Sequence, residues 1–493
     1  MSNGPLIIQG GMGAGVSNWR LARAVSEQGQ LGVVSGIALA HILARRLQDG
    51  DLGGHMRRGL DHFPFPDVAE RIWRKYHVSG GKAASAPYKF VPMPVKDMSP
   101  EFVELCIVGN FVEVFLAREG HDNPVGINYL EKIQIPHLPS IFGAMLAGVG
   151  YVLMGAGVPL KIPGILDRLA NFEPVTYSLQ LAGAPEAVDS TVSFDPRKFM
   201  EHDLLPLTRP KFLAIVSSNT LAATMLRKAN GKVDGLVIES PTAGGHNAPP
   251  RGKLQLTESG EAIYGERDKV DLKGIRALGV PFWLAGGYGA PERVRQALAA
   301  GAAGVQVGTA FEFCTESGLR SDYKEAILQK VASGHGKVFT DPASSPTGFP
   351  FKAAQLEGSA SERQVYLARV RTCDLGYLRE LYATDEGTIG YRCPAEPEDN
   401  NIAKAGTMAK TLGKKCLCNS LLANIGQPQL RIDHSVEEGL VTAGDDLAGI
   451  GRFFPANGGT TYSAADVIAK LCGGIPSAAN GAPPALVENL QPV

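Results

Sequence analysis

Eight short apolar segments, separated by longer and mostly helix-like stretches, constrain the fold more than any other feature of this sequence. They lie at residues 6–9, 31–34, 125–129, 151–154, 212–216, 235–238, 282–285 and 305–307. Strands buried on both faces of a parallel sheet are apolar throughout rather than alternating. Such strands in alternation with helices predict βα units, and eight units predict an α/β fold of the (β/α)8 TIM-barrel type.

Two gaps between the apolar segments are too long for ordinary βα loops. Residues 36–121 follow the second segment, and their last part, 101–119, has the pattern of the missing barrel helix. Residues 172–210 precede the fifth segment. There, 174–181 could form a ninth parallel strand, but 191–194 offers it a partner, so we predict an added hairpin.

The βα rhythm stops before the chain ends. After residue 335 the sequence becomes rich in turns, glycine and proline. We therefore predict a barrel over residues 1–335 and a C-terminal extension over 336–493. The extension is expected to pack on the barrel rather than to form an independent catalytic domain.

The charge balance bears on the partners of the chain. Lys and Arg together number 48 and Asp and Glu 49, a net charge of −1. Proteins that bind nucleic acid through its phosphates show a basic excess, so no nucleic-acid partner is expected. A homo-oligomer is compatible with the sequence.

One uncharged stretch resembles a membrane span. Residues 133–160 contain no Asp, Glu, Lys or Arg, but they hold three prolines and five glycines. A spanning helix needs about 20 continuous apolar residues. We therefore predict a buried helix, a glycine break and a buried strand, and no membrane partner. The N-terminus lacks signal-peptide features, and the odd number of cysteines fits a reducing compartment, so we expect a cytoplasmic protein.

Glycine-rich loops follow three of the predicted strands. Residues 10–15 contain four glycines, but their spacing misses the GxGxxG dinucleotide motif. The loops at 285–289 and 307–310 follow the seventh and eighth strands, where barrels often bind phosphate. Free amides in these turns attract an anion, and Thr309 adds a hydroxyl. The alternative is that the glycines only tighten turns.

A histidine and an asparagine lie at predicted strand ends, where barrel enzymes place their active sites. His246 follows two glycines after the sixth strand. An imidazole titrates near neutral pH and can act as a general base, although most histidines are only hydrogen-bonded structural residues. Asn128 lies near the end of the third strand and offers amide groups to a polar ring.

The segments around these residues resemble one enzyme family. They read QGGMGAGVS, GINYL, LMGAGVP, ESPTAGGH, LAGGYGAPERVRQALAAGAAGVQVGT and FCTESG. In this order they resemble the nitronate monooxygenases, also called 2-nitropropane dioxygenases. Their superfamily includes the FMN-dependent enoyl reductases of fatty-acid and polyketide synthesis. The resemblance covers roughly residues 4–330.

The resemblance implies an FMN cofactor across the C-terminal mouth of the barrel. Gly11 to Gly13 would lie behind the isoalloxazine, and Asn128 would bond to it. His246 would take the α-proton of a nitroalkane or face the substrate. The implied cofactor contacts are Gly11, Met12, Gly13, Asn128, Glu239, Gly244, Gly245, Gly286, Gly287, Gly308 and Thr309, the last four of them at the phosphate.

Two departures keep the monooxygenase and reductase alternatives close. Family monooxygenases usually have Gln-Gly-x-Glu before AGGH, where this chain has residues 239–242, Glu-Ser-Pro-Thr. The acidic Glu239 and the 172–210 insertion are more similar to the polyketide-type enoyl reductases. The pair Glu316 and Ser317 is more similar to the monooxygenases.

Cysteines offer weaker candidates. Cys393, Cys416 and Cys418 could be metal ligands, but structural zinc sites want four ligands, usually with CxxC pairs, so we expect no metal. Cys314 could be a nucleophile, but a small buried residue is the better interpretation.

Three hypotheses follow for function. The first is an FMN-dependent oxidoreductase that oxidises alkyl nitronates with O2. The second is an NAD(P)H-dependent FMN reductase of an enoyl thioester. The third is a catalytically silent barrel that acts as a binding module. The first two share a small-molecule substrate and differ in the electron partner.

Overall fold

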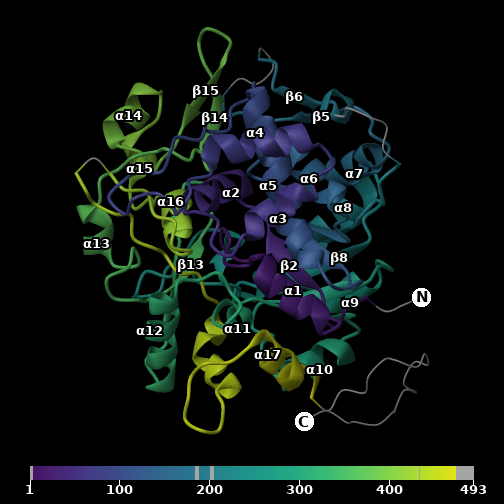
Figure 1. Cartoon of the computed structure of the whole chain (residues 1–493). Helices are drawn as coiled ribbons and strands as arrows, with labels where there is room; N and C mark the ends of the chain where they lie inside the picture. Colours follow the sequence, from purple (N-terminus) through teal and green to yellow (C-terminus); the bar gives the residue numbers. More distant parts are fainter. Residues whose placement is uncertain (1–3, 184–187, 200–204, 432, 474–493) are drawn as a thin grey trace, which may run out of the picture.

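Eight parallel strands form a closed barrel in the computed structural model, which describes residues 4–183, 188–199, 205–431 and 433–473 (Figure 1). The strands are β1 (Ile7–Gln9), β2 (Gly32–Ser35), β3 (Val125–Leu130), β4 (Tyr151–Gly155), β7 (Lys211–Val216), β8 (Gly235–Glu239), β10 (Phe282–Ala285) and β11 (Gly304–Val307). Their order in the sheet is β1-β11-β10-β8-β7-β4-β3-β2. Leu31 closes the circle, because its N–H donates to Ile7 O at 3.0 Å and its carbonyl accepts from Gln9 N at 2.9 Å. The predicted TIM-barrel class is confirmed.

The strands are apolar because both of their faces are buried. Ile8, Val33, Leu153, Leu213 and Val237 belong to a separate core cluster enclosed by the strands. Neighbouring residues on the same strands, whose side chains alternate in direction, join the larger core formed with the helices. The eight strands therefore lack the alternation of apolar and polar residues that strands with one exposed face show.

Helices cover the outside of the barrel. They are α1 (Trp19–Glu27), α5 (Pro100–Arg118), α6 (His137–Leu146), α7 (Ile162–Ala170), α8 (Asn219–Lys228), α9 (Leu272–Arg276), α10 (Pro291–Ala299), α11 (Thr309–Glu312) and α12 (Ser321–Ala332). Asn18 caps α1 by accepting from Leu21 N, and Pro291 occupies the first turn of α10. The uncharged stretch forms α6 and β4, and none of the helices in the described residues is long and apolar enough to cross a bilayer.

The two predicted insertions contain regular structure. The first holds α2 (Leu39–Gln48), α3 (His55–Asp61) and α4 (Pro66–Tyr76) before the barrel helix α5. The second holds β5 (Val175–Ser178) and β6 (Thr191–Phe194), which pair antiparallel, followed by the 3-10 helix η2 (Pro196–Phe199). The hairpin prediction is thus confirmed, and no ninth parallel strand joins the barrel within the described residues.

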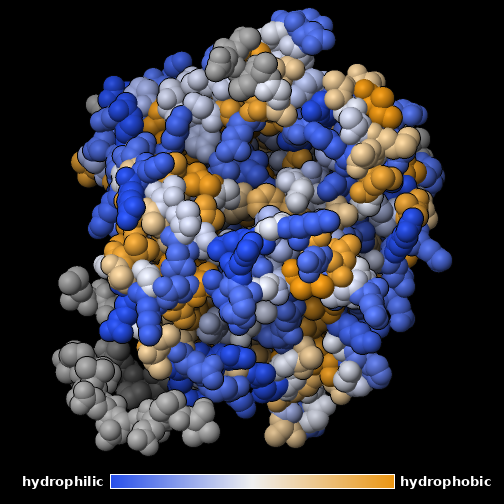
Figure 2. Space-filling view, turned by 180° about the vertical axis from the view of Figure 1, so that it is seen from behind, coloured by the Kyte–Doolittle hydropathy of each residue, from blue (hydrophilic) through white to orange (hydrophobic). Residues whose placement is uncertain are grey.

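In Figure 1, the described chain after residue 335 lies mostly along the left side of the barrel, with residues 380–392 at the top and residues 464–472 at the lower end. Its elements are β12 (Val338–Asp341), β13 (Phe351–Ala354), α13 (Arg363–Ala368), β14 (Glu380–Ala383), β15 (Ile389–Arg392), α14 (Glu398–Ala403), α15 (Met408–Thr411), α16 (Leu417–Ala423), η4 (Asp445–Phe453) and α17 (Ala464–Cys472). Helix α17 packs on α1 and α10, and η4 packs on α11 and α12. In the reverse view, hydrophobic residues are scattered among hydrophilic ones (Figure 2).

Candidate active site

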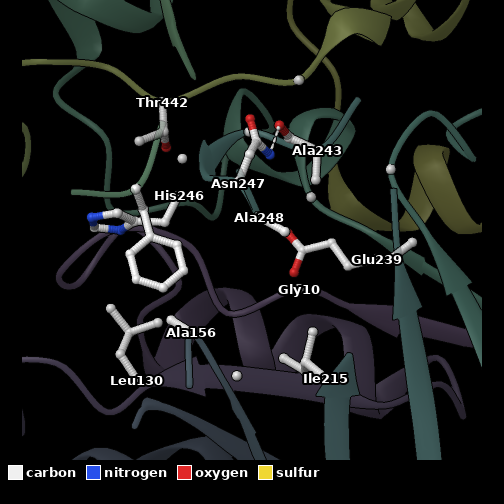
Figure 3. Close-up of a pocket in the computed structure, with 18 of the residues that line it drawn as sticks. Gly10, Leu130, Ala156, Ile215, Glu239, Ala243, His246, Asn247, Ala248 and Thr442 are labelled. Atoms are coloured by element: carbon white, nitrogen blue, oxygen red, sulfur yellow. Dashed lines mark hydrogen bonds between the residues drawn. The ribbon is translucent and has the colours of Figure 1, made fainter. Parts of the chain in front are cut away.

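A cavity of about 490 Å³ lies at the C-terminal ends of the barrel strands (Figure 3). Residues that follow all eight strands line it, together with residues of the C-terminal extension. All twelve candidate site residues are among them: Gly11, Met12, Gly13, Asn128, Glu239, Gly244, Gly245, His246, Gly286, Gly287, Gly308 and Thr309. The structure therefore brings these residues together, while their individual roles stay predictions.

The loops after β10 and β11 present unpaired amides. The N–H groups of Gly286, Gly287, Gly308 and Thr309 have no acceptor among the described residues. Gly286 has a φ of +87°, and a Cβ there would lie 2.4 Å from Ser240 Oγ. This conformation and this close approach both require glycine. Buried amides normally find a partner, so four open ones on a cavity wall favour an anionic ligand.

A carboxyl group from the extension lies at the same corner. Asp446 accepts hydrogen bonds from the Thr309 hydroxyl and from Gly289 N, and burial raises the pKa of Asp446. Thr309 Oγ1 in turn accepts from Gly444 N at 2.9 Å. The extension therefore places a titratable acid beside the open amides.

The first glycine loop lies directly against the end of β3. A Cβ on Gly11 would lie 2.4 Å from Asn128 Cβ, so only glycine fits there. Ser17 holds the loop, because its hydroxyl donates to Gly10 O at 2.9 Å and accepts from Met12 N at 2.8 Å. The side-chain amide of Asn128 has no hydrogen-bond partner in the described part of the chain and lines the cavity, where it is available to a ligand.

His246 is held by the C-terminal extension. It forms β9 (Gly245–His246), which pairs antiparallel with β13, and its ring meets the Phe351 ring edge-on at 4.9 Å between centroids. Its Nε2 is 2.8 Å from Ser345 Oγ, whereas Nδ1 has no partner among the described residues. Burial, and then the charge of Lys132, lower the pKa of His246 well below its ordinary value. The imidazole is therefore neutral at pH 7 and can accept a proton.

Two ionisable residues of opposite type, Glu239 and Lys132, interact electrostatically in the region of the cavity. Glu239 ends β8, and its carboxyl extends toward the middle of the lining residues in Figure 3. Burial raises the pKa of Glu239 to about 7, with Lys132 acting in the opposite direction. Burial also lowers the pKa of Lys132 to about 7, against Glu239 and Glu131. Both groups can change charge at neutral pH.

A buried glutamic acid completes the titratable set. Glu312, at the end of α11, accepts from Thr442 Oγ1 at 3.0 Å. Burial raises the pKa of Glu312 to about 8, so it carries a proton at neutral pH. Glu312, Thr442, Lys132 and Ser345 were not predicted from the sequence. Two of them lie beside a noted motif, because Lys132 is two residues after the GINYL segment and Glu312 directly precedes FCTESG.

The chain is similar in sequence to proteins described as nitronate monooxygenases. Residues 184–343 match the family described as nitronate monooxygenase. The resemblance to nitronate monooxygenases is confirmed. A nitronate monooxygenase of Pseudomonas aeruginosa is 28% identical over 239 residues, and a probable nitronate monooxygenase of Bacillus subtilis is 35% identical over 115. These matches cover 48% and 23% of this chain, and 61% and 31% of the two relatives.

Three solved structures align over 95% of this chain at low sequence identity. FabK of Thermotoga maritima aligns over 95% of this chain and 91% of its own, with 17% identity and a TM-score of 0.44. A nitroalkane oxidase of Streptomyces ansochromogenes aligns over 95% and 94%, with 16% identity and a TM-score of 0.46. The enoyl reductase domain of MlnA from Bacillus amyloliquefaciens aligns over 95% and 93%, with 12% identity and a TM-score of 0.46.

Glu239, which departs from the usual nitronate monooxygenase sequence, and Glu316, which is similar to it, occupy different places. Glu239 lines the cavity, as does the Ser240–Thr242 turn that lies under Gly286. Glu316 does not line it, because its carboxylate accepts from Ala464 N at 2.9 Å at the start of α17. The Glu316 similarity therefore concerns a structural contact, while Glu239 can affect a ligand.

The cysteine candidates lie outside the cavity, apart from one. Cys393, Cys416 and Cys418 cluster with Cys373 in the extension, and only Cys418 lines the cavity. No group of three or more His, Cys, Asp or Glu within the described ranges is arranged to hold a metal ion. Cys314 is buried and donates to Phe311 O at 3.1 Å, and burial raises the pKa of its thiol. None of the described contacts makes it a nucleophile.

Proposed function

We propose that this chain is an FMN-dependent oxidoreductase of the nitronate monooxygenase type. The observation that carries the proposal is that His246, with a free Nδ1, and four open amides line the same cavity. The amides suit a phosphate, and the histidine suits proton transfer. The similarity to nitronate monooxygenases supports the same assignment.

The residues around the cavity fit FMN. A volume of about 490 Å³ is in the range of cofactor sites. Gly286, Gly287, Gly308 and Thr309 would hold the phosphate, and the loop of Gly11 to Gly13 leaves room for a flat ring beside the Asn128 amide. When bound, FMN supplies a two-electron acceptor that O2 can reoxidise.

The protein itself handles binding and the proton. His246 Nδ1 would take the α-proton of a neutral nitroalkane, whose electron pair stays on the substrate as the nitronate. The rings of Phe349 and Phe351 restrict water around the imidazole. A preformed nitronate would need no base.

Reduction of an enoyl thioester by NAD(P)H is the second candidate, and the position of Glu239 favours it. A carboxyl group replaces the amide of monooxygenases at the end of β8 and faces the cavity. A silent binding module is the third candidate. The intact glycine loops and the available His246 weigh against it.

Two measurements separate these functions. Oxygen uptake with an alkyl nitronate is expected from the purified flavoprotein, and anaerobic NADPH is expected to leave its visible spectrum unchanged. Rapid anaerobic bleaching by NADPH or NADH without nitronate turnover would replace the proposal with the reductase. A well-folded protein that does not take up FMN would replace it with the binding module.

A further inference from the structure

A chain of hydrogen bonds leads away from the candidate base. His246 Nε2 lies 2.8 Å from Ser345 Oγ, and Ser345 Oγ lies 2.8 Å from Thr347 Oγ1. Lys132 Nζ lies 3.2 Å from the same Thr347 oxygen. The chain thus connects the loop after β3, the segment between β12 and β13, and β9.

The hydroxyl groups can be satisfied in either direction. Each hydroxyl has one donor and two lone pairs, and Ser345 Oγ also accepts from Thr347 N at 3.2 Å. When Lys132 is an ammonium, it donates to Thr347, Thr347 to Ser345, and Ser345 to His246 Nε2. The histidine proton then lies on Nδ1. When Lys132 is a neutral amine it can accept, the order reverses, and Nδ1 carries a free lone pair.

We propose that Thr347 and Ser345 form a proton relay that delivers the proton taken by His246 to the amine of Lys132. This proposal rests on the proposed function, because it concerns the α-proton of a nitroalkane. It makes Lys132, Thr347 and Ser345 parts of the proton pathway in addition to His246.

The transfer balances without any further reactant. The substrate C–H bond breaks, its electron pair stays on the substrate, and a new N–H bond forms at Nδ1. The Nε2 proton passes to Ser345 Oγ, the Ser345 hydroxyl proton to Thr347 Oγ1, and the Thr347 hydroxyl proton to Lys132 Nζ. The histidine ends neutral, Lys132 ends as an ammonium, and nothing is oxidised or reduced.

The surroundings favour a proton on Lys132 rather than on His246. The Lys132 amine lies 4.1 Å from the centre of the Phe349 ring, which stabilises a cation. Glu239 and Glu131 raise its pKa, whereas burial lowers it to about 7. Lys132 is the charged group that acts on His246, and it disfavours an imidazolium there. Lys414 donates to the Ser345 carbonyl at 2.9 Å and leaves the Ser345 hydroxyl to the relay.

The relay predicts a tautomer change that needs no substrate. In full-length protein with ¹⁵N-labelled histidine and its bound flavin, the ring proton of His246 should move between Nε2 and Nδ1 near pH 7 as Lys132 titrates. The chemical shifts of the two ring nitrogens should report this tautomer exchange. Thr347→Val should abolish this exchange, and Thr347→Ser should restore it. Thr442→Val is the matched control, because it removes a hydroxyl from the same cavity wall outside the chain.

A second variant guards against misfolding of Thr347→Val. Lys132→Arg keeps a donor that cannot lose its proton, so it should hold the proton on Nδ1 at every pH from 6 to 9. An unchanged tautomer exchange in either folded variant would overturn the relay, as would its loss in Thr442→Val.

Kinetics provide an independent measurement. Thr347→Val should lower kcat/KM for a neutral nitroalkane at least about tenfold more than for its preformed nitronate, since only the former needs a base. Equal losses on both substrates would contradict the relay. A wild-type protein that turns over neither substrate would reject the proposed function, while the tautomer measurement would still decide the relay.

Discussion

Glu239 and Lys132 form the pair of residues in the cavity region whose charge is most sensitive to pH near neutrality. Burial raises the pKa of Glu239 to about 7 and lowers that of Lys132 to about 7. As the pH rises from 6 to 8, the net charge of the pair moves from positive to negative. A dianionic cofactor should therefore bind more weakly as the pH rises.

Glu239→Gln should flatten this pH dependence of FMN binding. For the wild-type protein, we expect Kd to rise about tenfold between pH 6 and pH 8, which corresponds to a loss of about 1.4 kcal/mol of binding free energy. The variant keeps only the Lys132 titration and should show less than half of this rise on a logarithmic scale. Fluorescence titration at several pH values measures it, and parallel pH profiles would disprove the assignment.

The same substitution predicts a stability change with a definite sign. Folding raises the pKa of Glu239, so the contribution of this residue to the free energy of unfolding is fully present when the pH is below its ordinary pKa. This contribution is lost as the pH rises through about 7. Glu239→Gln should therefore gain stability relative to wild type at pH 8 and show little gain at pH 5.

Asp446 should weaken binding of the cofactor phosphate. It sits at the open amides and keeps contacts to Thr309 and Gly289 that an asparagine oxygen can also make. Asp446→Asn should tighten FMN binding by about threefold to tenfold above pH 7, where repulsion between like charges is removed. Riboflavin, which lacks the phosphate, is the matched ligand. An equal effect on both ligands would contradict a phosphate at this corner.

Individual residues could be predicted from the sequence only where a local pattern marked them. His246 and the glycines lie in loops that follow apolar strands. Because such loops gather at the C-terminal end of a barrel, these residues could be predicted to lie together. Ser345 is 99 residues away from His246 and meets it only through the pairing of β13 with β9. A lysine after a strand has no distinctive pattern, so Lys132 required the fold.

At the scale of elements, strands and helices were predictable for different reasons. The eight strands were found because burial on both faces makes them apolar, and α5 because its pattern runs for 19 residues. The short helices α2 to α4 and the small sheet of β9, β12 and β13 depend on tertiary contacts. A two-residue strand such as β9 has no sequence signal.

The contact between β2 and α1 is a tight element interface. A Cβ on Gly32 would lie 1.8 Å from Ala22 O, a backbone atom that cannot move aside alone. Gly32→Ala should destabilise the protein by about 3 kcal/mol or more, in the upper range for overpacking. Gly265→Ala, where no atom lies within 4 Å, is the control and should change little. Denaturation midpoints of the two variants test this, and equal midpoints would contradict the packing.

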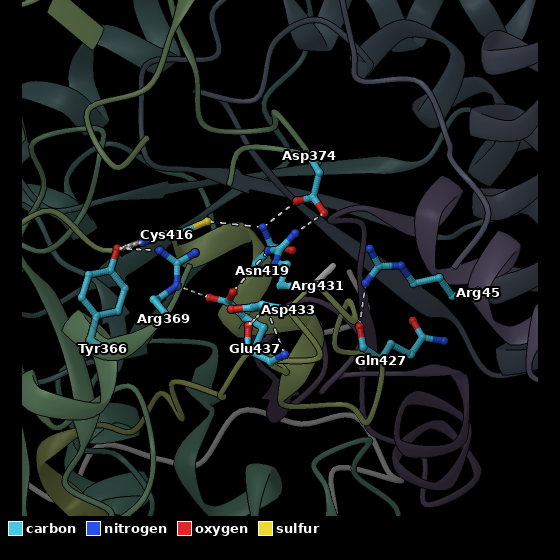
Figure 4. Close-up of polar contacts among 11 residues, drawn as sticks. Arg45, Tyr366, Arg369, Asp374, Cys416, Asn419, Gln427, Arg431, Asp433 and Glu437 are labelled. Carbon is cyan, nitrogen blue, oxygen red and sulfur yellow. Dashed lines mark hydrogen bonds and ion pairs between the residues drawn. The ribbon is translucent and has the colours of Figure 1, made fainter. Parts of the chain in front are cut away.

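At the scale of the whole molecule, the C-terminal extension completes the cavity that the barrel begins. It contributes Ser345, Phe351, Thr442 and Asp446 to the region around the barrel mouth. A buried network stabilises it: Glu437 pairs with Arg369 at 2.6 Å and Arg431 at 3.2 Å (Figure 4). Arg431 also pairs with Asp374 at 2.8 Å. The boundary between barrel and extension stays a prediction.

Glu437→Gln should destabilise the molecule strongly. Glu437 is 2% exposed, and removing its charge leaves the buried Arg369 without a carboxylate partner and Arg431 with Asp374 alone. Breaking a buried pair costs about 3–5 kcal/mol. Glu357→Gln removes a carboxylate that pairs with Lys330 at 3.4 Å and is 85% exposed, and it should cost less than about 1 kcal/mol. Chemical denaturation of both variants measures the two losses in free energy of unfolding, and proteolysis locates the segment that is loosened. Equal losses in the two variants would refute the prediction.

FMN is expected to bind in the cavity through its phosphate. Titration of flavin-free protein with FMN and with riboflavin, followed by fluorescence, measures this. We predict one FMN per chain and an affinity for FMN at least about 100-fold above that for riboflavin, or about 2.7 kcal/mol, from charge-assisted bonds to the open amides. Equal affinities, or no binding of either flavin by folded protein, would contradict phosphate recognition at this site.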